Sequence, residues 1–377
     1  GGKTNIVKIV RDEIKLEEQA AKGYTIPVQS SGGQQSLVGV IEIPTFYLDF
    51  DAKTAGKKEY KSTTRDVQQI IKRLTKKEVS GIIIDVRNNG GGSLSEATGL
   101  TGLFINKGPV VQVKNWRGKL DLERDEQKGV VYGGPLLVLV NRNSASASEI
   151  FAGAIQDYGR GLIVGEPTFG KGTVQNLVDL NRYNEGAGKL GQLKTTMAQF
   201  FRVNGDSTQH RGVIPDIHFY GFPAPDNHGE KGLDNALPWA KIGQASYRRS
   251  NFDSTIIESI ADAHRQRTKE DRKFQHFIAS EKRILEAQGK NIISLVESIR
   301  ENEYKQNKKN QLAFENKFRV LHDLKPLPIE KSDQTDLDEA DENEDLYSDP
   351  KFDSLLMETG KIMVDFTSKL ATAKPQN

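Results

Sequence analysis

The sequence predicts an α/β protein with a mainly helical C-terminal region. Between about residues 23 and 217, short apolar runs that resemble buried strands alternate with stretches of helical character. Such alternation is typical of a largely covered sheet with helices packed on it. After about Trp239, apolar residues recur at helical spacing among many charged residues. We therefore expect a domain at 23–240 that contains the sheet and a helical, charge-rich domain at 241–377.

The elements of the first domain are predicted in chain order from these runs. Apolar runs predict strands over Leu37–Ile43, Gly81–Val86, Leu136–Val140, Gly161–Gly165 and Thr173–Leu180. The intervening stretches predict helices over Thr63–Leu74, Ser95–Phe104 and Ser148–Tyr158. The helix at Thr63–Leu74 is amphipathic, with Val67, Ile70, Ile71 and Leu74 on one face.

The C-terminal domain combines three kinds of segment. Helical apolar spacing runs through residues 251–320 and ends at Leu324–Pro328. Residues 330–349 hold ten acidic residues and one basic residue, which predicts a solvated linker. A last amphipathic helix is expected at about 351–370. Its apolar residues available for docking are Phe352, Leu355, Leu356, Ile362, Met363 and Phe366.

Composition excludes several classes of function. The 53 basic and 51 acidic residues leave a net charge of +2, which argues against a nucleic-acid surface. The chain has no cysteine, which excludes disulfides, thiolate catalysis and cysteine-ligated zinc. Its six histidines show no spacing of metal ligands, so we expect neither a metal nor a cofactor. The longest apolar run, Leu136–Val140, is far shorter than the roughly 18 residues of a membrane span.

Two segments place glycine or serine between a strand and a helix. Residues 82–93 run from an apolar strand into three glycines, a turn whose N–H groups can face an oxyanion. Residues 141–151 contain three serines that alternate with alanine before a helix, where a nucleophile would lie near the helix N-terminus. In both places a capping box, Ser93 with Glu96 or Ser146 with Glu149, is an equally simple structural explanation.

A third segment, residues 164–175, contains a lysine between glycines. It nearly matches a phosphate-binding loop, but Gly172 replaces the metal-binding hydroxyl and a strand follows instead of a helix, so we expect no nucleotide. Burial would instead favour the neutral amine of Lys171 and suit it to act as a base. The alternative interpretation is that Lys171 is an ordinary lysine in a surface turn. A fourth segment, Gln209–Ile217, leads into a strand and has no role that its residues alone indicate.

The order and spacing of these segments resemble the carboxyl-terminal processing peptidases, in particular the bacterial tail-specific branch. The matching stretches are IIIDVRNNGGGSLSEA, NRNSASASEIFAGAIQDYGR, VGEPTFGKGTVQ and RGVIPDI, which extend from about Ser80 to Ile217. The resemblance implies a serine peptidase with an α/β catalytic core related to crotonases.

The resemblance also implies roles for individual residues. Ser146 matches the nucleophile and Lys171, 25 positions later, matches its general base. Asp157 matches a position counted with the catalytic group in the tail-specific branch, and Gln175 matches a residue that orients the lysine. The oxyanion hole would use main-chain N–H groups of Gly91 or Gly92, and of Ala147.

The residue types agree with a Ser–Lys pair. Serine needs a base to remove its proton during attack. Residues 80–200 contain neither histidine nor cysteine, so Lys171 is the base candidate that remains in this segment.

The resemblance further implies how the protein finds its substrates. Residues 1–22 look like the end of a peptide-binding PDZ domain and its exit, and the chain opens with Gly-Gly-Lys. We expect a fragment rather than a mature chain whose leader was removed. Expected partners are unfolded proteins or peptide C-termini, with an envelope adaptor protein as a further candidate. The expected location is the bacterial periplasm, and association with the inner membrane stays open.

Two other functions share some of these features. A crotonase-like acyl-CoA enzyme would use the same fold and an oxyanion hole, but it would not need the Ser–Lys pair, and the sequence shows no basic cluster for CoA phosphates. A catalytically silent scaffold that binds unfolded tails would tolerate loss of Ser146 and Lys171, and both are present.

Overall fold

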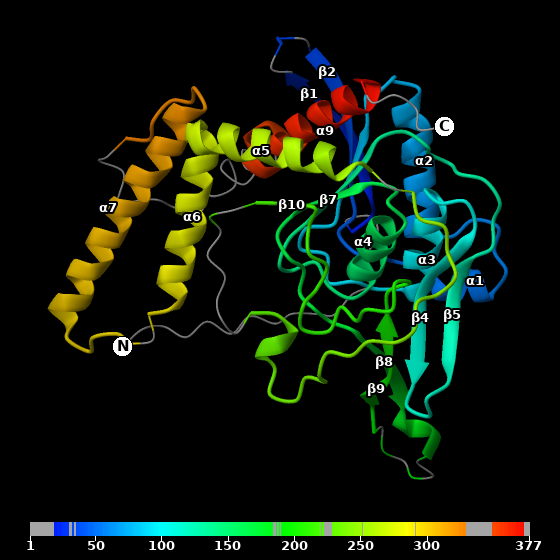
Figure 1. Cartoon of the computed structure of the whole chain (residues 1–377). Coiled ribbons are helices and arrows are strands. Elements are labelled where there is room, and N and C mark those ends of the chain that lie inside the picture. Colours follow the sequence, from blue (N-terminus) through cyan, green and yellow to red (C-terminus); the bar gives the residue numbers. More distant parts are fainter. Residues whose placement is uncertain are drawn as a thin grey trace.

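The computed structural model describes residues 19–29, 32–33, 35–183, 186, 188, 190–219, 221, 228–250, 252–290, 292–328 and 349–372 (Figure 1). Most of the segment at 1–22 that the sequence relates to a PDZ domain lies outside these residues. So does the acidic linker at 330–349, except for its last residue.

A 6-stranded sheet forms the centre of the molecule, in the order β1-β2-β3-β6-β7-β10. The bounds of its strands are β1 Lys22–Gln29, β2 Gln35–Glu42, β3 Ile82–Asp85, β6 Leu136–Val140, β7 Leu162–Gly165 and β10 Ile217–His218. β1 is antiparallel to β2, and all other neighbours are parallel. The central strands β3 and β6 are buried along their whole length, as expected for parallel strands covered on both faces.

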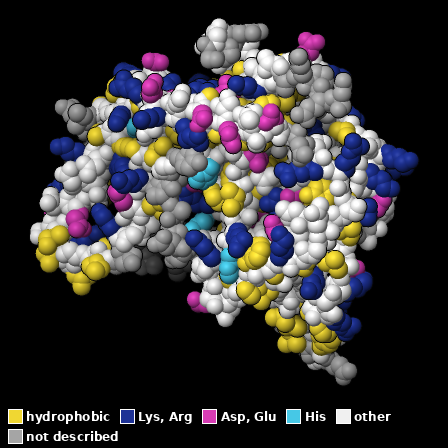
Figure 2. Space-filling model, viewed as in Figure 1, with side chains coloured by type: hydrophobic (Ala, Val, Ile, Leu, Met, Phe, Trp, Pro, Cys, Tyr) yellow, Lys and Arg dark blue, Asp and Glu magenta, His cyan; other side chains and the backbone are white. Residues whose placement is uncertain are grey.

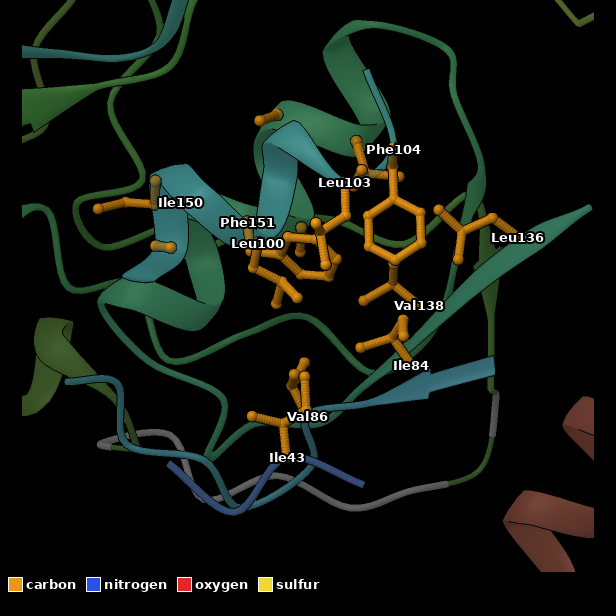
Figure 3. Close-up of a cluster of buried hydrophobic side chains, with 14 of the residues drawn as sticks. Ile43, Ile84, Val86, Leu100, Leu103, Phe104, Leu136, Val138, Ile150 and Phe151 are labelled. Carbon is orange, nitrogen blue, oxygen red and sulfur yellow. The ribbon is translucent and has the colours of Figure 1, made fainter. Parts of the chain in front are cut away.

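Three helices cover one face of this sheet: α2 Thr63–Thr75, α3 Leu94–Gly102 and α4 Ala147–Asp157. Successive strand residues point to opposite faces, so Ile82 and Ile84 of β3 both face these helices. Figure 3 shows Ile84 near Val138 of β6, with Phe104 and Phe151 packed above them. The apolar side of α2 that the sequence predicts lies in the same cluster.

C-terminal helices cover the opposite face: α5 Ser254–Glu270, α6 Arg272–Gln288 and α9 Ser354–Thr372. Ile83 of β3 and Leu137 of β6 point into this second cluster, together with Leu356 and Phe366 of α9. Buried charges reinforce the packing, because Glu358 of α9 accepts hydrogen bonds from His264 and Arg267 of α5. The last amphipathic helix therefore docks on the sheet that carries the N-terminal elements.

A second, 4-stranded antiparallel sheet has the order β5-β4-β9-β8. Its strands are β4 Gly108–Asn115, β5 Leu120–Asp125, β8 Thr173–Asp179 and β9 Gln192–Phe201. β8 begins two residues after Lys171, and it is an edge strand because β9 is its only neighbour in the sheet. This sheet extends away from the helical layers (Figure 1).

The helix α7, Glu297–Leu321, packs beside α6 to form an arm that projects from the rest of the molecule (Figure 1). Apolar side chains gather at the far end of this arm, and basic and acidic side chains are interspersed over the same face of the molecule (Figure 2). The large apolar residues exposed there are Ile292, Ile293, Leu295, Val296 and Ile299. The short helix α1, Phe50–Thr54, completes the described α-helices.

The predicted α/β class is confirmed, and each predicted element of the first domain is present within two residues of its expected bounds. The strand expected at the end of Gln209–Ile217 is β10, whereas β1 and three strands of the second sheet, β4, β5 and β9, were not predicted. The relation of the core to crotonases stays a prediction.

Candidate active site

Three loops meet at one edge of the main sheet. β3, β6 and β7 are adjacent and parallel, so their carboxyl ends lie side by side. The three segments that the sequence singles out follow these strands directly, at residues 86–93, 141–146 and 166–172. Carboxyl ends of parallel strands are where open α/β sheets bind ligands. The topology thus brings the glycine, serine and lysine segments to one place.

Ser146 lies at the turn between β6 and α4 in a strained conformation. Its φ of 57° and ψ of −110° are rare for a residue with a side chain. The same kind of sharp strand-to-helix turn exposes the serine in α/β hydrolases. The Ser146 N–H donates to Glu149 Oε2 at 2.8 Å, so the glutamate half of the predicted capping box is present. The amide of Glu149 donates to the main-chain oxygen of Ser146 at 2.9 Å.

The glycine loop approaches the serine so closely that a side chain would not fit. Gly91 has a φ of +108°, and a Cβ placed on it would lie 2.8 Å from Ser146 Cβ and 3.1 Å from Ala147 N. The Gly91 N–H donates to Asn89 Oδ1 at 2.8 Å. The N–H groups of Gly92 and Ala147 have no acceptor in the described part of the chain. These two N–H groups are therefore the available donors for an oxyanion.

Hydrogen bonds join the glycine loop to the serine loop. The main-chain oxygen of Asn89 accepts from Ala145 N and from Ser148 Oγ, both at 2.9 Å. Ser144 Oγ donates to the main-chain oxygen of Val86 at 2.8 Å. Asn89, Ser144 and Ser148 are each fully buried. The serines on either side of Ser146 thus hold the two loops together, a function their alternation with alanine did not indicate.

Lys171 is partly buried and lies beside Gln175 of β8. Its Nζ donates to Gln175 Oε1 at 3.3 Å. Within the described residues no hydrogen bond joins this amine to the Ser146 hydroxyl. Burial lowers the pKa of Lys171 below its ordinary value, and nearby Lys194 lowers it further, whereas Glu230 and Glu149 act in the opposite direction. The lysine is therefore biased towards its neutral form.

Glu149, which the sequence analysis treats only as part of a capping box, contacts both the serine loop and the lysine loop. Its carboxylate is completely buried and accepts four hydrogen bonds. The donors are Ser146 N and Lys171 N to Oε2, at 2.8 and 2.9 Å, and Thr168 Oγ1 and Gly170 N to Oε1, both at 2.7 Å. Because one oxygen binds the amides of both Ser146 and Lys171, the two main chains lie within the combined length of two hydrogen bonds. Burial raises the pKa of Glu149 to about 7, although the four donated bonds lower it.

The fourth segment supports the lysine loop. Gln209 is fully buried and its Oε1 accepts from Gly172 N at 2.8 Å. The amide of His210 donates to the main-chain oxygen of Gly170 at 2.8 Å, and that of Val213 donates to Thr168 Oγ1 at 2.7 Å. The residues of this segment alone indicated no role, and the structure shows the segment packed against the loop that carries Lys171.

Asp157 lies away from the other predicted site residues. It ends α4, the helix that begins after Ser146, which places it about 15 Å along the helix axis. Its carboxylate accepts from Arg202 Nη2 at 2.6 Å, Arg202 Nε at 3.1 Å and Asn204 Nδ2 at 2.9 Å. The structure therefore places Asp157 in an ion pair that joins α4 to the end of β9, and it does not bring this carboxylate to Lys171.

The described residues contain no group of three or more His, Cys, Asp or Glu side chains placed to hold a metal ion. They also contain no helix with the length and apolar character of a membrane span.

Comparisons with known proteins agree with the architecture of the site. Residues 37–219 match Peptidase family S41, and residues 224–368 match the C-terminal domain of tail specific protease (DUF3340). The chain is 41% identical to the Tail-specific protease of Haemophilus influenzae over 73% of this chain and 37% of that protein. It is 34% identical to a Carboxy-terminal-processing protease of Bartonella bacilliformis over 61% of this chain and 46% of that protein.

One solved structure among the matches is a photosystem II D1 C-terminal processing protease. It is 28% identical, with a TM-score of 0.43, over 57% of this chain and 53% of its own. The chain spans less than half the length of the two bacterial relatives. The two matched segments together extend over residues 37–368 and include all of the loops described above. The chain thus belongs to peptidase family S41 and carries the C-terminal domain of its tail-specific proteases.

Proposed function

We propose that the chain is the catalytic part of a serine endopeptidase in which Ser146 is the nucleophile and Lys171 is the general base. The observation that carries this proposal is the buried Glu149 carboxylate, one oxygen of which accepts the amides of both residues. Gly91 packs against Ser146 on the other side. Nucleophile, base and oxyanion donors are thereby held on three adjoining loops.

In the first half of the reaction, Ser146 Oγ attacks the carbonyl carbon of the scissile peptide. The neutral amine of Lys171 takes the hydroxyl proton as the Oγ–C bond forms, and the carbonyl oxygen becomes an oxyanion. The N–H groups of Gly92 and Ala147 would stabilise this oxyanion, helped by the positive N-terminal end of α4. The Lys171 ammonium then donates its proton to the leaving nitrogen as the C–N bond breaks.

In the second half, water attacks the acyl group on Ser146 and Lys171 takes a proton from that water. The ester bond breaks and the proton returns to Ser146 Oγ, which releases a carboxylic acid product. Gln175 supports the lysine, since its Oε1 accepts from Nζ in the resting site. For this step the Lys171 amine must turn from Gln175 towards Ser146. Catalytic hydrogen bonds often form or shorten in this way only when substrate binds.

The proposed substrates are unfolded proteins or exposed C-terminal segments in the bacterial cell envelope. The names of the relatives, tail-specific and carboxy-terminal-processing proteases, support this choice. The location of the site on open loops at a sheet edge also supports a polymeric substrate.

Covalent labelling with an acylating β-lactone tests the assignment. The parent chain should gain one acyl group, mapped to Ser146 by mass spectrometry, and should cleave an unfolded protein. Ser146→Ala should neither label nor cleave, whereas Ser144→Ala and Ser148→Ala should keep part of the activity. Labelling at Ser144 or Ser148, or undiminished cleavage by Ser146→Ala, would exclude Ser146 as the nucleophile. Cleavage of an acyl-CoA thioester without peptide cleavage would favour the acyl-CoA enzyme instead.

A further inference from the structure

An ion-pair cluster joins the C-terminal helix to the strand that carries the glycine loop. Arg87 follows β3 by two residues, and its guanidinium contacts two carboxylates. Asp85, the last residue of β3, accepts from Arg87 Nη2 at 2.6 Å and from Nε at 3.0 Å. Asp353, which immediately precedes α9, accepts from Nη2 at 2.6 Å and from Nη1 at 3.2 Å. The cluster therefore bridges the segment that matches the S41 peptidases and the segment that matches DUF3340.

Asp353 has a second partner that fixes its position. Its Oδ1 accepts from Leu356 N at 2.9 Å, so the carboxylate also caps the first turn of α9. The helix behind it is anchored in the sheet by buried residues such as Leu356 and Phe366. The packing of α9 therefore fixes the position of the Asp353 carboxylate that binds Arg87.

Arg87 in turn precedes the residues that form the oxyanion loop. Asn89, two positions later, is fully buried and accepts Gly91 N through its side chain. Its main-chain oxygen accepts Ala145 N from the serine loop. A displacement of Arg87 would therefore reach Gly91 and Gly92 through a short chain segment that Asn88, Asn89 and Gly91 tie to neighbouring loops by hydrogen bonds.

We propose that Asp353 is a positioning residue for the oxyanion loop, acting through Arg87, so that the C-terminal segment completes the active site. This inference rests on the proposed peptidase function. This ion-pair cluster, called the clamp below, holds the Arg87 guanidinium between the carboxylates of Asp85 and Asp353. The side chains of Arg87 and Asp353 are only 16% and 25% exposed. Taking such groups from water is costly, and precise geometry is a documented use of partly buried ion pairs.

The test compares two isosteric substitutions in the same region. Asp353→Asn keeps an oxygen to cap α9, because asparagine caps as well as aspartate, but it turns an NH2 group towards Arg87. Asp365→Asn is the matched control. It removes a charge from α9 that accepts Arg267 Nη1 at 3.0 Å, without contact to the glycine loop. The measurements are kcat and KM for an unfolded substrate, and hydrogen exchange of residues 86–93.

Asp353→Asn should lower kcat roughly tenfold with little change in KM, since displacing an oxyanion donor affects the transition state. It should also speed exchange of residues 86–93, whereas Asp365→Asn should change neither. In the background of Arg87→Gln, Asp353→Asn should have no further effect. Equal effects of the two single substitutions, or unchanged exchange in Asp353→Asn, would show that the clamp only anchors the helix. If the parent neither cleaves nor is acylated at Ser146, the proposed function fails, and the exchange result still shows whether Asp353 holds the loop.

Discussion

Glu149→Gln tests whether the buried carboxylate holds the nucleophile and the base together. Glutamine has nearly the same shape, but one of its terminal groups is an NH2. In the native site each carboxylate oxygen faces two donors. Whichever way the glutamine turns, the two hydrogen bonds that one carboxylate oxygen accepted are lost. With the NH2 group at the Oε1 position, the Thr168 hydroxyl can turn to accept from it and replace one of them, but the Gly170 N–H still faces a donor.

The free-energy cost follows from these two losses. A hydrogen bond to a charged group contributes about 1.5–3 kcal/mol, so two of them amount to about 3–6 kcal/mol. The neutral side chain avoids the cost of burying the charge. The pKa of Glu149 is raised from 4.5 to about 7, so burial disfavours the charged form by roughly 3 kcal/mol more than the four hydrogen bonds favour it. These effects oppose each other, so we expect the free energy of unfolding to change by less than about 3 kcal/mol.

Activity should fall far more than stability. In either orientation an NH2 group faces a main-chain N–H of the lysine loop, that of Lys171 at Oε2 or that of Gly170 at Oε1. The loop that carries Lys171 should therefore shift, and misplaced reacting groups cost up to about 100-fold in rate. The assay is kcat/KM for an unfolded substrate, with denaturant unfolding of the same samples. Glu96→Gln is the matched control, because Glu96 holds the same third position in α3. There, one carboxylate oxygen accepts both Ser62 Oγ and Thr64 N, so glutamine can keep both bonds. Parent-like kcat/KM in Glu149→Gln, or equal damage in Glu96→Gln, would refute the reasoning.

Further predictions concern the pH dependence of stability, Lys171 and Asp157. Because the pKa of Glu149 is raised, its stabilising contribution is complete below pH 4.5 and is lost as pH rises to about 7. The stability of the parent relative to Glu149→Gln should therefore fall across that range in denaturant titrations, and a constant difference would contradict the assigned shift. Lys171→Arg should be inactive in a cleavage assay, since guanidinium cannot accept a proton near neutral pH, and full activity would identify another base. Lys194→Gln should raise the pKa of Lys171 and move the rising limb of the pH–rate profile to higher pH; an unmoved limb would show that it reports another group. Asp157→Asn should lower the unfolding free energy by a few kcal/mol in denaturant titrations, because it breaks a buried pair with Arg202. A loss of kcat in Asp157→Asn without loss of stability would instead support the expected place of Asp157 in the catalytic group.

The elements that sequence patterns predicted best are those whose burial is uniform. Leu136–Val140 became β6 with the predicted bounds, because all five residues are apolar and buried. The second sheet gave no such signal. β5, Leu120–Asp125, is mostly exposed and carries charges, and its pairing with β4 depends on contacts that no local pattern shows.

At the site, the sequence predicts contacts between residues close in the chain but not contacts between different loops. The pairing of Ser146 with Glu149 could be predicted as a capping box, because it joins residues three positions apart. The reach of the same carboxylate to Gly170 and Lys171 could not, because it depends on the adjacency of β6 and β7. The position of Asp157 was open to prediction, since three turns of helix separate it from Ser146.

The two family segments pack on the same sheet, and the strands from which the glycine and serine loops extend are covered by both. Along β3, Ile82 and Ile84 face α2, α3 and α4, whereas Ile83 faces α9. Without α9, that face would expose apolar side chains on the strands from which the glycine and serine loops extend. The loops keep their geometry only while their strands stay in place, so the position of Ser146 depends on residues more than 200 positions away in the sequence. The contact between Arg87 and Asp353 lies where this dependence is most direct, at the end of β3 and the start of α9.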